Sequence, residues 1–299
     1  MFTKSQEKAI VENWGRDACY KILRETEAYA EKWNLSDLYF SEHYSMNAIF
    51  YCDSERYGAC VLKIGLGFQD AEFISEYNVL REYDGRRFVR VFESGVEAGH
   101  KIMLMERISP GTMLKDEQRL DKRLAVFSEL FAGMHIAPAN AALYQSYAAK
   151  ANGYAEYIIS RDDCKELQSH MARANAICAS VCVGYPREML LHGDMNFGNI
   201  LLKNDGKYAA VDPQGLLGDP VFDIPRYVLS EYYHSFDIPA GQRIEKINHI
   251  IEYISGNLNI PHKILRQCFY VEIATFECWR ASTGDYDIDN VLFAEGIMG

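Results

Sequence analysis

The chain has 299 residues, 48% of them hydrophobic and 24% charged, so it is long enough for two domains and is not expected to be disordered. Its net charge of −11, from 31 basic and 42 acidic residues, argues against general nucleic-acid binding and suits solubility or a cationic substrate. The eight cysteines form no CxxC pair, the start is polar and no apolar run could span a bilayer, so we expect a cytoplasmic protein with reduced thiols.

The first third of the chain alternates between helical and strand-like patterns. A helix is expected at 5–33, with Thr3 or Ser5 as its cap. A second helix is expected at 70–83, where Phe73, Tyr77 and Leu80 share one side. Short apolar runs with turn residues between them predict strands at 38–40, 48–52, 59–64, 88–93 and 101–106.

The remainder is mainly helical, apart from an extended run at 188–212. Apolar periodicity or alanine content predicts helical structure in 120–134, 141–182, 222–234, 239–256 and 261–281. The change in pattern lies near 105–111. We therefore expect an α+β protein with two domains, a smaller β-rich one at 1–107 and a larger helical one at 108–299.

Two apolar strands in the extended run end in polar residues that suit phosphoryl transfer. Asp194 follows one strand, Asn199 lies five positions later, and Asp212 follows the next strand. Transfer of a phosphoryl group needs a carboxylate to accept the proton of the attacking hydroxyl, and a carboxylate with an amide oxygen to hold Mg²⁺. Asp194 is the candidate base, and Asn199 and Asp212 are the candidate metal ligands. An isolated His-Gly-Asp would more often be a simple turn.

The motif His192-Gly193-Asp194 with Asn199 resembles the catalytic loop of the aminoglycoside phosphotransferase family, which has a protein-kinase-like fold. The string VDPQGLLGDPVFDI at 211–224 is similar to the streptomycin 6-phosphotransferase and hydroxyurea phosphotransferase branch. The resemblance is close over 188–226. It implies a bilobal kinase fold and transfer of the γ-phosphate of ATP, with Mg²⁺, to a hydroxyl group of a small molecule.

Two further residues of this region have structural interpretations. By resemblance, His192 packs beneath the loop and forms hydrogen bonds there, and it is not the base. Asp223 either caps the helix that starts near Phe222 or braces the catalytic loop, as the equivalent residue does in the family.

A kinase nucleotide domain needs a lysine on its third strand, which contacts the α- and β-phosphates, and a glutamate on the next helix, which holds the lysine in place. Lys63 is in the third expected strand, between apolar residues. Glu76 shares the inward side of the helix at 70–83 with Leu80, and Glu72 is the alternative one turn earlier. A solvent-exposed edge-strand lysine is the competing interpretation of Lys63.

The remaining nucleotide contacts are positional expectations. The loop at 42–47, which would cover the phosphates, has no glycine, so Ser45 and Asn47 are its candidates. The segment at 103–108 would be the hinge whose backbone contacts adenine, which makes Met105 and Arg107 candidates; an ordinary strand is the alternative.

The acceptor would lie against the C-terminal helices, where carboxylates could bind a cationic molecule. The candidates are Glu231 and Glu277, chosen from several acids that include Glu272, and Trp279, which could stack on a ring. A streptomycin-like aminoglycoside is the first choice of acceptor. The alternatives are a metabolic kinase of the same fold acting on a sugar, choline or homoserine, and a nucleotide-binding module without catalysis. Protein kinase activity is disfavoured, since Asp-Phe-Gly and Ala-Pro-Glu segments are missing.

Overall fold

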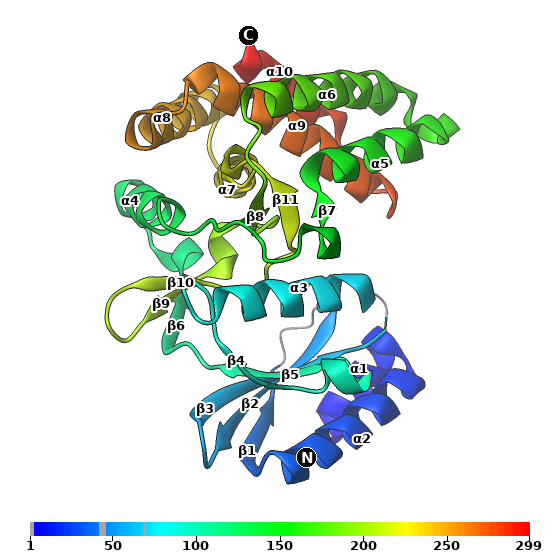
Figure 1. Ribbon diagram of the computed structural model, residues 1–299. Coiled ribbons are helices and arrows are strands. Elements are labelled where there is room, and N and C mark those ends of the chain that lie inside the picture. Colours follow the sequence, from blue (N-terminus) through cyan, green and yellow to red (C-terminus); the bar gives the residue numbers. More distant parts are fainter. Residues whose placement is uncertain (1–2, 42–45, 68–69) are drawn as a thin grey trace. The chain divides into compact units, whose positions relative to one another are not determined.

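The computed structural model describes residues 3–41, 46–67 and 70–299, which form two compact units (Figure 1). Unit 1 comprises Met1–Gly111 and Leu202–Val211. Unit 2 comprises Thr112–Leu201 and Asp212–Gly299. Unit 1 contains the main β-sheet and unit 2 is mostly helical, so the expected α+β class is confirmed. No helix of the described residues has the length and apolar character needed to cross a membrane.

The sheet of unit 1 has five antiparallel strands in the order β1-β2-β3-β5-β4. The strands are β1 (Leu35–Phe40), β2 (Asn47–Ser54), β3 (Gly58–Gly65), β4 (Val91–Ser94) and β5 (Ile102–Glu106). β2 and β3 form a hairpin in which Ser54 pairs with Gly58, around the turn that the sequence predicts. All five strands were predicted, with small differences at their ends.

Helices cover both faces of this sheet, and the alternation along β3 assigns its side chains to them. Cys60, Leu62 and Ile64 are buried in one apolar core with residues of α1 (Lys4–Trp14) and α2 (Arg16–Lys32). Lys63 therefore lies on the opposite face, where it meets α3 (Asp70–Tyr83).

The single helix predicted at 5–33 is wrong, because Gly15 separates α1 from α2. Gly15 has φ 85° and ψ 169°, a combination that is open only to glycine, and it ends one helix and starts the next. The predicted cap at Thr3 is present. Its hydroxyl accepts a hydrogen bond from the main chain of Gln6, whose side chain accepts one from the main chain of Thr3.

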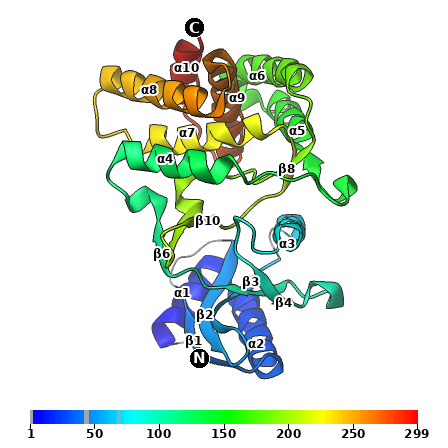
Figure 2. The same ribbon diagram turned by 60° about the vertical axis from the view of Figure 1, so that its left-hand side comes forward.

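Unit 2 is built around α9 (His262–Ala281), which lies among the other helices of the unit in Figure 2. Most residues of α9 are buried. Helices α5, α6, α7, α8 and α10 all pack against it. The helices of the unit are α4 (Leu120–Phe131), α5 (Tyr147–Ile159), α6 (Lys165–Gly184), α7 (Ile224–Tyr233), α8 (Ala240–Leu258), α9 (His262–Ala281) and α10 (Ile288–Met298). The Ala-rich stretch at 141–182 thus contains two helices, and α10 was not predicted.

Short strands in two small sheets make up the rest. One sheet has the order β7-β11-β8 and the other has the order β10-β9-β6. The strands are β6 (Pro110–Met113), β7 (Gln145–Ser146), β8 (Met189–Leu191), β9 (Ile200–Lys203), β10 (Tyr208–Ala210) and β11 (Leu216–Gly218). β8 and β11 are antiparallel, with Leu191 opposite Leu216, and their ends carry the polar residues described next.

Candidate active site

The loop after β8 is held by one buried carboxylate. The main-chain N–H groups of His192 and Gly193 donate to Oδ2 and Oδ1 of Asp223, each at 2.8 Å. Gly193 has φ 77°, and a Cβ there would approach Gln214 and Leu216 to about 3.2 Å, so the tight turn requires glycine. Asp223 thus braces the loop, and no side-chain cap on α7 is formed by it.

Histidines complete the surroundings of Asp223. His135 Nε2 lies 2.9 Å from Asp223 Oδ2. Burial raises the pKa of Asp223, but the hydrogen bond and charge of His135, with His192 and the Gly193 N–H, outweigh burial and lower the pKa below its usual value. His192 is fully buried, and its Nδ1 accepts from the Asp194 N–H at 3.2 Å. Its position beneath the loop matches the structural interpretation.

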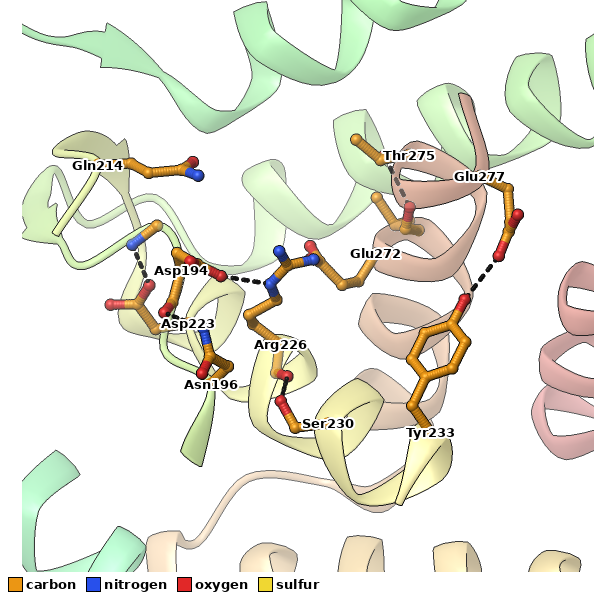
Figure 3. A network of polar contacts seen from close by, with 12 residues as sticks. Asp194, Asn196, Gln214, Asp223, Arg226, Ser230, Tyr233, Glu272, Thr275 and Glu277 are labelled. Atoms are coloured by element: carbon orange, nitrogen blue, oxygen red, sulfur yellow. Dashed lines mark hydrogen bonds and ion pairs between the residues drawn. The ribbon is translucent and has the colours of Figure 1, made fainter. Parts of the chain in front are cut away.

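The Asp194 carboxylate accepts from one donor on each of its two oxygens, and Figure 3 shows the bond from Arg226. Arg226 Nε donates to Oδ1 at 2.6 Å. Asn199 Nδ2 donates to Oδ2 at 3.2 Å and to the main-chain oxygen of Asp194 at 3.0 Å. Sequence reasoning missed Arg226. Its position three residues after Asp223, on the same side of α7, was the available signal.

These bonds fix the orientation of the Asn199 amide. Because both nearby partners are acceptors, the nitrogen faces them and Oδ1 points elsewhere. Asn199 ends a short 3₁₀ turn that Asn196 caps by accepting from Gly198 N–H at 2.8 Å. The amide oxygen of Asn199 is therefore available as a hard ligand for a cation.

Asp212 lies on the strand-like segment beside the loop. The main-chain N–H of Gln214 donates to the His192 oxygen at 2.7 Å, which aligns this segment antiparallel to the loop. Asp212 is exposed and has φ 59°, a left-handed conformation that is uncommon for a residue with a side chain. Such conformations concentrate at functional sites.

The described residues contain no cluster of three His, Cys, Asp or Glu side chains that could hold a metal by themselves. The donor set of Asn199 and Asp212 fits Mg²⁺, because this ion often takes only one or two protein ligands and completes its shell with phosphate oxygens and water.

Lys63 and Glu76 form a buried ion pair in unit 1. Lys63 Nζ lies 2.7 and 2.6 Å from Oε1 and Oε2 of Glu76, and both residues are at most 5% exposed. The structure therefore pairs Lys63 with Glu76, the first choice of the two glutamates. Met105 is buried on β5, and the guanidinium of Arg107 lies 4.5 Å from the Tyr51 ring.

Asn47 is the first residue of β2. Ser45 and most of the expected phosphate loop lie outside the described residues.

The two acids predicted to bind an acceptor have internal partners. Glu231 is fully buried and accepts from Arg123 Nε at 2.6 Å and Nη2 at 2.8 Å, with Lys246 at 3.1 Å. Glu277 is also fully buried and accepts from Tyr233 at 2.7 Å and Asn290 at 2.8 Å. Neither carboxylate is exposed to bind a ligand.

Trp279 has the opposite character. It is 49% exposed and stacks on Phe276, with ring centroids 5.4 Å apart.

Sequence comparisons find a matching family and similar proteins of known function. A family model described as aminoglycoside/hydroxyurea antibiotic resistance kinase matches residues 49–284. The hydroxyurea phosphotransferase of Kitasatospora aureofaciens is 31% identical over 240 residues, 77% of this chain and 66% of that protein. The streptomycin 6-kinase of Streptomyces griseus is 28% identical over 147 residues, 48% of this chain and 47% of the kinase, so the match spans about half of that relative.

Solved structures show the same fold. Plasmodium vivax ethanolamine kinase superposes with a TM-score of 0.64 at 11% identity, covering 99% of this chain and 93% of that one. A thermostable mutant of aminoglycoside phosphotransferase APH(4)-Ia gives 0.59 at 16% identity, covering 91% and 96%. The protein-kinase-like fold expected from the sequence is confirmed. With the family match over residues 49–284, the chain belongs to the aminoglycoside/hydroxyurea antibiotic resistance kinase family.

Proposed function

We propose that this protein transfers the γ-phosphoryl group of ATP to a hydroxyl group of a small molecule, an aminoglycoside of the streptomycin type. The observation that carries the proposal is the Asp194 carboxylate, which is fixed in a braced loop beside the oriented amide of Asn199. The family match and the names of the relatives supply the acceptor class. The eight cysteines are free thiols, which suits a reducing cytoplasm as the place of action.

In the proposed reaction the acceptor hydroxyl oxygen forms a bond to the γ-phosphorus. The bond from the γ-phosphorus to the β,γ-bridging oxygen breaks, and its electron pair stays on ADP. Asp194 accepts the hydroxyl proton on a carboxylate oxygen. Each carboxylate oxygen has two lone pairs, so Oδ1 can bind the hydroxyl while it still accepts from Arg226.

Other residues bind the nucleotide in this proposal. Lys63 contacts the α- and β-phosphates, and Glu76 orients its ammonium group. Asn47 and Ser45 contact the phosphates, and the main chain at Met105 and Arg107 contacts the adenine.

Asn199 and Asp212 hold Mg²⁺, which neutralises negative charge on the phosphates. The exposed Asp212 carboxylate and the available Asn199 oxygen suit that task.

The surroundings of Glu231 and Glu277 do not support contact with the acceptor, because both are buried among protein partners. Trp279 remains in the proposal as a surface on which an acceptor ring can stack, since half of it is exposed.

The test is a turnover assay with the purified protein, ATP and Mg²⁺. Acceptors would include streptomycin, hydroxyurea, ethanolamine, choline, homoserine and simple sugars, with ADP release and the mass of the phosphorylated product as readouts. The proposal expects a product from streptomycin and none from Asp194→Asn. A product only from choline, homoserine or a sugar would move the chain to the metabolic kinases. Nucleotide binding without any product would identify a non-catalytic module.

A further inference from the structure

Arg226 connects the candidate base to a second carboxylate. Its Nε donates to Asp194 Oδ1 at 2.6 Å, and its Nη1 donates to Glu272 Oε1 at 3.2 Å. The guanidinium group thus lies between the two acids (Figure 3). About a fifth of the Arg226 side chain is exposed to solvent. The exposed fractions of the Asp194 and Glu272 side chains are 18% and 11%.

Several elements of unit 2 fix the position of this arginine. Glu272 on α9 uses its other oxygen, Oε2, to accept from the Tyr147 hydroxyl of α5 at 3.0 Å. The guanidinium also lies 4.7 Å from the ring centre of Phe276, one turn after Glu272. Tyr147 and Glu272 are both buried. The arginine therefore has defined contacts on the side away from Asp194, which prevents it from following the carboxylate if that group rotates.

Two residues at the start of α7 thus hold both the main chain of the loop and its Asp194 side chain. Asp223 holds the main chain of the loop through two N–H groups. Arg226, three residues later, holds the side chain that the loop carries. Residues three apart on a helix lie on the same side, so a rigid helix end sets both at once.

We propose, on the basis of the proposed phosphotransferase function, that Arg226 is a positioning residue that fixes the rotamer of the Asp194 base, and that Glu272 and Tyr147 fix Arg226 in turn. Oδ2 of Asp194 is oriented by Asn199 and Oδ1 by Arg226, so the carboxylate plane is defined from both ends. A hydroxyl that binds at the second lone pair of Oδ1 then meets the γ-phosphate in one direction only.

The charge of Arg226 has a second effect on the same step. A catalytic carboxylate and the triphosphate of ATP repel each other, and a cation in contact with the carboxylate weakens that repulsion. Arg226 stays protonated throughout. Burial lowers its pKa, but the carboxylates of Asp194 and Glu272 outweigh burial and raise it.

The experiment compares Arg226→Gln, Arg226→Lys and Arg226→Ala with the unsubstituted full chain, using kcat, the KM values for ATP and acceptor, and Tm. We expect kcat of Arg226→Gln to fall by about 10²-fold, as when a reacting group loses its orientation, while KM for ATP is unchanged. Arg226→Lys should retain part of the rate, because it keeps a positive charge near Asp194. Guanidinium ion, added below the concentration that affects Tm, should raise the rate of Arg226→Ala and not that of the unsubstituted protein.

Two further variants separate positioning from stability. Arg226→Gln leaves Glu272 without its cation, so the double variant Arg226→Gln/Glu272→Gln should regain Tm without regaining kcat. The matched control is Arg187→Gln, which breaks a two-bond pair with buried Asp219, at 2.7 and 3.0 Å, and has no bond to Asp194. It should lower Tm and keep kcat.

The outcomes distinguish this inference from the function on which it rests. Turnover by the unsubstituted protein with an unchanged kcat in Arg226→Gln would overturn the role of Arg226 alone. The role of Arg226 would also be overturned if kcat and Tm fell together in both Arg226→Gln and Arg187→Gln and guanidinium ion did not raise the rate of Arg226→Ala. Absence of turnover with every acceptor in the unsubstituted protein would overturn both.

Discussion

Asp223 accepts the main-chain N–H of His192 on Oδ2 at 2.8 Å, so a carboxylate directly before α7 fixes the backbone two residues before Asp194. Its Oδ1 does the same for Gly193. In Asp223→Asn one of these buried N–H groups would face an amide NH₂ instead of an acceptor. An unsatisfied buried donor costs about 1–3 kcal/mol of unfolding free energy. We also expect kcat to fall by about 10²-fold, because the loop that carries the base shifts.

Chemical denaturation and turnover measurements check this prediction. Asp237→Asn, at an exposed position of the same unit, is the control and should change neither quantity. Full activity in Asp223→Asn would show that the loop keeps its shape without the brace.

The Lys63–Glu76 pair yields a second prediction, because both members are buried. Lys63→Met should lower kcat/KM for ATP by about 10²-fold, the scale for loss of one preorganised cationic or hydrogen-bond donor. It should also cost about 3–5 kcal/mol in unfolding free energy, since Glu76 stays buried without its cation. The double variant Lys63→Met/Glu76→Leu should recover stability and not activity.

Urea unfolding and steady-state kinetics on the single and double variants give the two readouts. If the double variant also recovered kcat/KM, Lys63 would have no part in binding the nucleotide. Lys8→Met is a control, since Lys8 forms an exposed ion pair with Glu12.

The sequence predicts those features of the fold and site that depend on residues close together in the chain. Strands and helices with clear periodicity, such as α3 and the β2–β3 hairpin, follow from local pattern, and the pairing of Lys63 with Glu76 follows from their positions on them. The spacing of Asp194 and Asn199 identifies the loop.

Long-range contacts could not be found in this way. The bond from Arg226 to Asp194 spans 32 positions, and the bond to Glu272 spans 46. Glu231 was a candidate because a cationic acceptor needs carboxylates on the C-terminal helices, but it is buried against Arg123, which lies 108 positions away. The break at Gly15 was missed because the apolar pattern continues through it.

The buried pair of Glu231 and Arg123 gives the third prediction. Glu231→Gln should cost about 3–5 kcal/mol of unfolding free energy, because Arg123 is left buried without a counter-charge. It should leave KM for the acceptor unchanged, since the side chain is fully buried. A large rise in acceptor KM at unchanged stability would contradict this and return Glu231 to the binding surface.

The pKa of Glu231 makes the stability lost in Glu231→Gln depend on pH. Burial raises the pKa of Glu231, but Arg123 and Lys246 outweigh burial and lower it. With a lowered folded pKa, the unfolded state takes up the proton first as pH falls, so stability decreases with falling pH. The contribution is complete well above pH about 4.3, the unfolded value, and is lost below it. The stability gap between the unsubstituted protein and Glu231→Gln should therefore narrow in urea titrations below that pH.

Asp212 allows stability and function to be separated at one position. Its φ of 59° is left-handed, a conformation that costs an ordinary L-residue about 1–2 kcal/mol and glycine almost nothing. Asp212→Gly should thus be more stable than Asp212→Ala by roughly that amount, although glycine loses some of the advantage through its freer unfolded chain. Both should lose turnover, because neither supplies a carboxylate to the metal.

Denaturant unfolding of the two variants, with kcat measured over a range of Mg²⁺ concentrations, checks both parts. Asp212→Asn is the informative third variant, because it tolerates the left-handed backbone and keeps one oxygen ligand. It should be more stable than Asp212→Ala and require more Mg²⁺ than the unsubstituted protein to reach half of its maximal rate. Equal Mg²⁺ dependence in Asp212→Asn and the unsubstituted protein would mean that the carboxylate at 212 does not bind the ion, and the strained backbone would then need another explanation.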